Sequence, residues 1–138
     1  IEVIKVFKLQ PENPETIPFI RLLLGLNPND LSLHSSLAHI YKQLGKEEEM
    51  KKELLILVSA YSQLISKSPK YPKHHFSLAV IYNELGEYEK SYQEALITLK
   101  LEPALKFDVE ALIGTKLPSI YWDKYSKGKD RSTDTYQF

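Results

Sequence analysis

Residues 34–45 read HSSLAHIYKQLG, and residues 75–86 read HFSLAVIYNELG. Eight of these twelve positions carry the same residue in both stretches: His, Ser, Leu, Ala, Ile, Tyr, Leu and Gly. Two unrelated stretches of ordinary composition would share about one position in twelve. The chain therefore contains a duplicated unit, and the two copies lie 41 residues apart.

The spacing of the prolines adds a second period. Pro28 and Pro69 are 41 residues apart, whereas Pro69 and Pro103 are 34 apart, and Phe7 precedes Tyr41 by 34. A 34-residue unit accounts for all of these spacings if the middle copy carries seven additional residues between Gly45 and Pro69. Seven residues make about two helical turns, so the added piece keeps its face in register with the rest of a helix.

Each copy has the pattern of a helix, a turn and a second helix. Asp30 or Ser32 can cap the first helix of one copy, and Pro72 suits the first turn of the corresponding helix in the next. Gly45 and Gly86 follow the last apolar residues, where a glycine can take the left-handed conformation that ends a helix. Second helices are predicted at 46–68 and 88–101. The apolar stripes of the first helices comprise Leu33, Leu37, Ile40, Tyr41 and Leu44 in one copy and Phe76, Ala79, Tyr82 and Leu85 in the next.

The flanking sequence extends this pattern. Residues 17–26 indicate the second helix of an earlier unit, with Pro18 near its start. The 34-residue spacing predicts a helix at 1–10, although the apolar residues there also suit a strand. Downstream we expect a helix at 105–116 and a terminal helix at 118–125, whose Ile120, Tyr121, Trp122 and Tyr125 cover the last repeat. The prediction is one repeat domain over residues 1–125, with units near 1–30, 31–71 and 72–105, terminal helices at 105–125 and a loose polar tail at 126–138.

Composition excludes several classes of function. The 138 residues include 18 basic and 18 acidic side chains, which argues against a nucleic-acid binder that works through bulk charge. The absence of Cys removes disulfides, thiolate zinc sites and cysteine nucleophiles. No apolar run approaches the roughly 18 residues that span a bilayer, so we expect no direct membrane insertion. The chain begins at Ile1 without an initiator Met, and we interpret it as a piece of a longer or processed protein whose compartment is unknown.

This arrangement resembles the tetratricopeptide repeat. The signature of that family places an aromatic residue, Leu, a small residue, Tyr, a turn Gly and a closing Pro in order. The clearest match here comprises His75, Leu78, Ala79, Tyr82, Gly86, Ser91, Ala95 and Pro103, and the earlier copy matches through His34, Leu37, Ala38, Tyr41 and Gly45. The resemblance covers about residues 3–103. It implies an all-α, right-handed superhelical solenoid of antiparallel helix pairs, with about three units and a C-terminal capping helix.

The resemblance also implies a function: non-catalytic binding of a peptide or partner protein in a concave groove lined by the first helices. Residues outside the apolar stripes would face that groove. These are Ser35, His39, Lys42 and Gln43 in one copy and Phe76, Val80, Asn83 and Glu84 in the next, with Lys73 as a flanking cation. Some family members hold a C-terminal carboxylate with Lys, Asn and Arg at such positions, and these residue types do not match that clamp. Phe76 and Val80 instead predict an apolar contact beside a cation, unless the terminal helix folds into the groove and covers them.

The predicted helix at 46–68 is apolar on most of its faces between Leu54 and Ile65. A helix that is apolar all round is normally buried on both sides, whereas the second helices of a solenoid lie outside. One interpretation is a homodimer or partner interface that includes Leu55, Val58 and Ser62. The alternative is that this helix packs on the chain's own terminal segment.

No pattern in the chain indicates catalysis or a cofactor. There is no glycine loop that would cradle a phosphate and no nucleophile elbow, so we expect neither an enzyme nor a cofactor site. His34 and His75 stand at the aromatic position of the signature and are interpreted as packing residues, not as metal ligands. The basic run at 116–131 is interpreted as a solvated tail, with contact to an anionic surface as the alternative.

Overall fold

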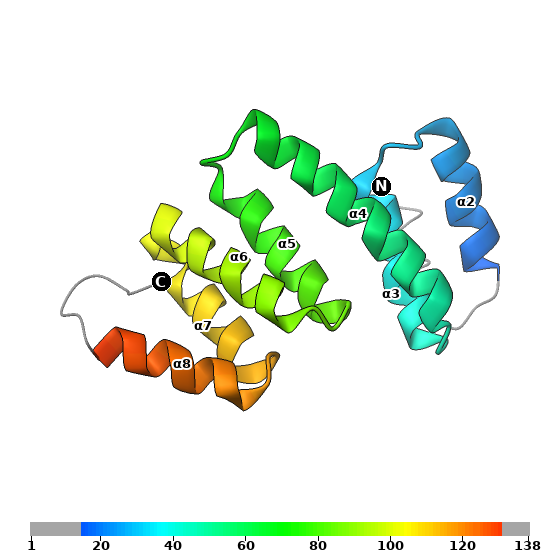
Figure 1. Cartoon of the computed structure of the whole chain (residues 1–138). Coiled ribbons are helices and arrows are strands. Elements are labelled where there is room, and N and C mark those ends of the chain that lie inside the picture. Colours follow the sequence, from blue (N-terminus) through cyan, green and yellow to red (C-terminus); the bar gives the residue numbers. More distant parts are fainter. Residues whose placement is uncertain (1–14, 131–138) are drawn as a thin grey trace. The chain divides into compact units, whose positions relative to one another are not determined.

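The computed structural model describes residues 15–130, and this part of the chain is helical without strands. In the numbering of Figure 1 its α helices are α2 (Thr16–Leu26), α3 (Leu31–Gln43), α4 (Glu47–Lys67), α5 (Pro72–Glu84), α6 (Tyr88–Leu101), α7 (Lys106–Thr115) and α8 (Ser119–Asp130). A 3-10 turn, Pro103–Leu105, precedes α7. The all-α prediction is confirmed, while the helix expected at 1–10 and the residues after 130 lie outside the described part.

The chain divides into two compact units, residues 1–60 and residues 61–138. In the first unit α2 packs against α3 and buries Thr16 and Ile20. In the second unit α6 packs against both α5 and α7, and α7 packs against α8 (Figure 1). Within the described residues, no helix combines the length and the apolar character needed to cross a bilayer.

The helix ends follow from local chemistry. The carboxylate of Asp30 caps α3 by accepting hydrogen bonds from the main-chain N–H groups of Ser32 and Leu33, at 3.0 and 3.3 Å. It also accepts the Ser32 hydroxyl at 2.7 Å, and this bond and the two N–H bonds outweigh burial and lower the pKa of Asp30. Gly45 and Gly86 have φ of 74° and 78°, the left-handed conformation predicted for these two turns.

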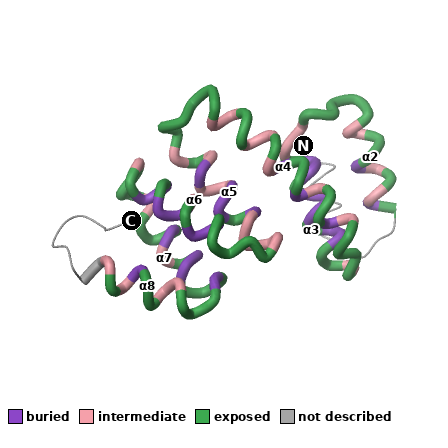
Figure 2. Tube along the Cα trace, in the orientation of Figure 1, coloured by how far each residue is buried: buried purple, intermediate pink, exposed green. Residues whose placement is uncertain are grey.

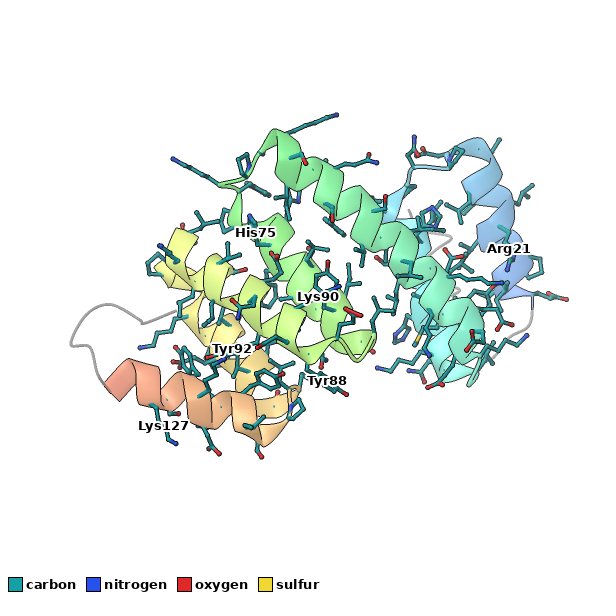
Figure 3. All side chains as sticks on the ribbon, viewed as in Figure 1. Arg21, His75, Tyr88, Lys90, Tyr92 and Lys127 are labelled. Carbon is teal, nitrogen blue, oxygen red and sulfur yellow. The ribbon has the colours of Figure 1, made fainter. Side chains whose placement is uncertain are left out.

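Each copy of the repeat holds a buried histidine between two acceptors. His34 Nδ1 lies 2.7 Å from Glu53 Oε1, and His34 Nε2 lies 2.9 Å from the main-chain oxygen of Pro28. His75, labelled in Figure 3, repeats the arrangement with Glu94 Oε1 at 2.7 Å and the main-chain oxygen of Pro69 at 2.8 Å. Each ring therefore joins the first helix, the second helix and the connection that precedes the first helix. We call this three-way contact the histidine bracket.

At His34 the bracket favours a protonated ring. Both ring nitrogens face acceptors, and only the imidazolium has an N–H donor for each of them. Burial alone would lower the pKa of His34. The hydrogen bonds to Glu53 and to the Pro28 carbonyl, with the negative charges of Glu53 and Asp30, outweigh burial and raise the pKa above the ordinary 6.5. The sequence indicated packing residues at His34 and His75, and the structure adds this polar role to their burial.

The length of α4 shows where the seven additional residues of the middle repeat unit lie. α4 has 21 residues and α6 has 14, a difference of seven residues or about two turns. Glu53 follows His34 by 19 residues, and Glu94 follows His75 by the same number. The additional residues therefore lie after Glu53, in the C-terminal half of α4, where they leave the bracket unchanged.

The second unit has an apolar core built mainly from α6 and α7. Its buried residues are Ala79, Tyr92, Ala95, Leu96, Leu99, Val109, Leu112, Ile113, Leu117 and Tyr125. Val109 stands 34 residues after His75 and is fully buried, so α7 has an aliphatic side chain where α3 and α5 have the bracket histidine. Ser91 links α6 to α5, because its hydroxyl donates to the main-chain oxygen of Ala79 at 2.6 Å.

Helix α8 corrects two predictions about the C-terminal segment. Tyr121 and Trp122 pack against the core and Tyr125 is buried, as expected, but Ile120 is 67% exposed and covers nothing. Residues 126–130 are helical and not part of a loose tail. The hydroxyl of Tyr125 donates to Glu110 at 2.6 Å. This contact anchors the middle of α8. The helix can continue beyond Tyr125 because no proline follows in the sequence to interrupt it.

We expect the free energy of unfolding to decrease as the pH rises above 6.5, the ordinary pKa of histidine. A group whose folded-state pKa is raised contributes its full stability below the unfolded pKa, and this contribution is lost as the pH rises through the folded pKa. His34 is such a group. Urea unfolding followed by circular dichroism at several pH values measures the effect. Glu53→Gln should cost about 1 kcal/mol at pH 6 and flatten the pH dependence, and an equally steep dependence in that variant would contradict the bracket's role.

A second prediction concerns the N-cap of α5. Tyr71 occupies that position with φ −82° and ψ 109°, close to the −75° and 104° of Asp30 at the N-cap of α3, but its side chain makes no capping hydrogen bond. Tyr71→Asp should therefore raise stability by about 0.5–1 kcal/mol, since Asp is a good cap and only part of that gain is offset by the lost ring contact with His74. Thermal unfolding tests this, and Tyr71→Leu, which cannot cap, should show no such gain.

Candidate partner-binding surfaces

The twelve-residue repeat separates interior from surface. The eight positions that are identical in both copies are buried or half-buried, apart from the two turn glycines. The four positions that differ pair Ser35 with Phe76, His39 with Val80, Lys42 with Asn83 and Gln43 with Glu84. These are the positions that the sequence assigned to a partner-binding groove. The two copies thus share one scaffold and carry different side chains at these four positions.

In the first unit, the four groove residues of α3 are all exposed: Ser35, His39, Lys42 and Gln43. Their spacing places them along one side of the helix. The opposite side supplies the core with Leu33, Leu37 and Ile40, each at most 2% exposed. The exposed side of α3 is therefore polar along its whole length, with a histidine and a lysine in its C-terminal half.

In the second unit, the groove residues of α5 are less uniform. Lys73 is exposed and Val80 is 37% exposed, whereas Phe76 and Asn83 are half-buried. Phe76 packs against the apolar core of its unit, so it serves the fold as well as the surface. Val80 is the apolar side chain of this set that a partner can reach without disturbing the core.

The terminal aromatics lie against α6 and α7. The ring centroids of Tyr121 and Tyr92 are 5.2 Å apart, and Lys124 Nζ lies 5.3 Å from the centroid of the Tyr92 ring (Figure 3 labels Tyr92). A Cβ built on Gly114 would lie 3.4 Å from the ring of Trp122, an ordinary van der Waals distance, so α7 and α8 are in direct contact at this point. Val80 remains exposed with α8 in this position. The alternative in which the terminal helix covers both Phe76 and Val80 therefore fails at Val80, whereas Phe76 packs against the same core as Tyr121 and Trp122.

The exposed side of α4 contains a small apolar area in the first unit. Leu55 is 58% exposed and Ile56 is 44% exposed, while Lys51, Lys52 and Ser59 beside them on the helix are polar. Of the three residues predicted for self-association, Leu55 and Ser62 are exposed and Val58 is half-buried. The other side of α4 buries Met50, Leu54 and Leu57. Over its full length the helix is therefore amphipathic, and Leu55 and Ile56 are the large apolar residues exposed on its polar side.

Comparison of the chain with models of protein families, with curated proteins and with solved structures gave no match. The resemblance to the tetratricopeptide repeat therefore rests on the residues of this chain.

The described side chains contain no group of three or more His, Asp or Glu residues placed to hold a metal ion. Several side-chain contacts instead link one helix to another. The brackets are two of these, and a third joins α2 to α3: the Arg21 guanidinium donates to the Tyr41 hydroxyl and lies 5.9 Å from the centre of its ring (Figure 3). Sequence reasoning missed these contacts because the partners are far apart in the chain.

Proposed function

We propose that this chain is a non-catalytic protein-interaction module that binds a peptide or a segment of a partner protein. In this proposal the helix pairs stack as in a tetratricopeptide-like solenoid, and the exposed sides of α3 and α5 line one groove. No cofactor takes part.

The observation that carries the proposal is the division of the duplicated stretch. A buried His, Leu, Ala and Ile recur in both copies, each at most 9% exposed, and the brackets around the two histidines have the same geometry. The four positions that differ include every exposed residue of the stretch apart from the two glycines. A repeated interior with different exposed residues is the arrangement expected of a scaffold whose specificity lies in those side chains.

The chemistry of these side chains defines the expected ligand. The α3 surface carries hydrogen-bonding groups and the cation of Lys42, and the α5 surface carries Val80 beside Asn83. A segment with one apolar anchor and flanking polar or acidic groups would complement this set. A ligand recognised mainly by its terminal carboxylate would lack the clamp residues it requires.

Peptide selection from a random library with the purified chain tests this proposal. Val80→Glu should weaken the selected peptides by about tenfold or more, because it places a desolvated charge in the apolar contact. Ile97→Glu on α6 is the matched control, since Ile97 is 38% exposed against 37% for Val80. Fluorescence anisotropy measures both affinities. Equal affinity for the wild type and Val80→Glu would overturn the assignment of the surface.

The exposed Leu55 and Ile56 favour a second candidate, self-assembly through α4. The exposed apolar area is confined to these two adjacent residues, so the association would be weak.

Sedimentation velocity over a wide range of concentrations tests self-assembly. If α4 drives dimerisation, the sedimentation coefficient rises with concentration in the wild type, and Leu55→Glu removes the rise. Ser59→Glu is the control, because it adds the same charge one turn away on α4 without removing an apolar side chain. It should leave the concentration dependence in place. A wild-type monomer at every concentration removes this candidate.

A further inference from the structure

The stretch between Glu53 and Glu84 contains no acidic residue. Three lysines stand in it at intervals of three residues: Lys67 ends α4, Lys70 lies in the connection, and Lys73 is in the first turn of α5. All three are exposed, and the connection at residues 68–71 is exposed throughout (Figure 2). None of the ion pairs among the described side chains involves these lysines. Their charges are therefore available to a partner.

Aromatic rings accompany the lysines. Tyr71, in the same connection, is 46% exposed, and its ring centroid lies 4.6 Å from that of His74. The ring centroid of Tyr61, in the C-terminal half of α4, lies 5.8 Å from that of His74. His74 thus contacts both tyrosine rings in tilted arrangements, and its contact with Tyr71 restrains that side chain. A positioned tyrosine beside lysines offers a hydroxyl donor and an apolar ring surface at little entropic cost. We call Lys67, Lys70, Tyr71 and Lys73 the lysine–tyrosine corner.

The other copy of the repeat shows that the scaffold does not require this chemistry. Lys70, Tyr71 and Lys73 stand where the earlier copy has Asn29, Asp30 and Ser32. There the single acid is occupied by capping its own helix. The same backbone thus carries a negative charge in one copy and two positive charges in the other. Because folding is compatible with either, the lysines are not needed for the structure of the turn.

We propose that the lysine–tyrosine corner is a docking site for an acidic segment of a partner protein. A short acidic segment complements the lysines and can lie within the connection between α4 and α5. An extended polyanion, such as a nucleic acid or a charged membrane surface, would also approach the other end of α5, about 20 Å away by the rise of a 13-residue helix. Glu87 and Glu89 beyond that end are paired with Lys90 and Lys124, so the region offers no excess of positive charge to such a ligand. The balanced charge of the whole chain further favours the short ligand.

This site is distinct from the proposed groove, with which it shares only Lys73. The test therefore leaves Lys73 unchanged and uses Lys67→Gln/Lys70→Gln as the principal variant. Lys51→Gln/Lys52→Gln is the matched control, because it removes two exposed charges from the same helix α4 at a distance from the corner. Tyr71→Asp places a negative charge among the three lysines while supplying a helix cap, so misfolding cannot account for its loss of binding.

The probe is a fluorescein-labelled hexaglutamate peptide, with the corresponding hexaglutamine peptide as its neutral control, and fluorescence anisotropy is the readout. The wild type should bind the glutamate peptide and not the glutamine peptide, with affinity decreasing as salt increases. Lys67→Gln/Lys70→Gln should weaken binding by about fivefold or more, and Tyr71→Asp by at least as much, while Lys51→Gln/Lys52→Gln leaves it unchanged.

Several results would overturn the corner as the docking site. These are no binding of the glutamate peptide, an equal loss in both lysine pairs, or tighter lysine-dependent binding of a single-stranded oligonucleotide or of vesicles containing phosphatidylserine. Loss of glutamate-peptide binding in Val80→Glu but not in Lys67→Gln/Lys70→Gln would place the peptide on α5, which supports the proposed groove and overturns the corner. The opposite result is also informative. If the glutamate peptide binds the corner as predicted, but Val80→Glu does not change the affinity of the library-selected peptides, only the groove is refuted.

Discussion

The histidine bracket is the contact on which the rest of each repeat depends. An imidazole ring with an acceptor at each nitrogen holds three pieces of chain together: the connection before the first helix, the first helix, and the second helix through Glu53 or Glu94. A purely apolar contact at this position would be less directional, because dispersion and hydrophobic burial do not specify which atoms must meet. The bracket therefore fixes the relation of the two helices as well as contributing to their stability.

Because the bracket is an interior contact, the helix length and the exposed side chains of a repeat can differ between copies. The seven additional residues of α4 follow Glu53 and extend the helix without altering the contact between His34 and that carboxylate. The exposed residues of α3 and α5 differ, and the N-terminal turns of these helices carry opposite charges. The α7–α8 pair is joined by different contacts. α7 has the buried Val109 in place of the histidine, and the hydroxyl of Tyr125 on α8 donates a hydrogen bond to Glu110 on α7. Residues that make the interior contacts cannot change freely. Both proposed binding surfaces consist mainly of residues that take no part in those contacts.

Most helix limits were predictable because their causes are local. The cap at Asp30, the start of α5 at Pro72 and the turns at Gly45 and Gly86 depend on residues within a few positions of each other. Periodicity identified Leu33, Leu37 and Ile40 as core. The candidate surface on α3 was predictable for the same reason. Phe76 was assigned to both an apolar stripe and the groove, and periodicity could not decide between them, because its burial depends on α6 and α7. The end of α8 was placed at residue 125 because the following residues are polar and the anchoring contact with Glu110 lies 15 residues away.

By itself the sequence determined that this protein is a duplicated helix–turn–helix chain, since propensity, capping and repeat spacing act over short distances. The tertiary structure decided that His34 and His75 join two helices through buried hydrogen bonds and that Val80 is accessible while Phe76 is partly buried. It also decided that Tyr71 contacts the ring of His74 beside three lysines that take part in none of the ion pairs among the described side chains. Each of these depends on which groups from different helices come within a few ångströms. That proximity follows from packing, and it governs burial, protonation and the charge that remains available to a partner.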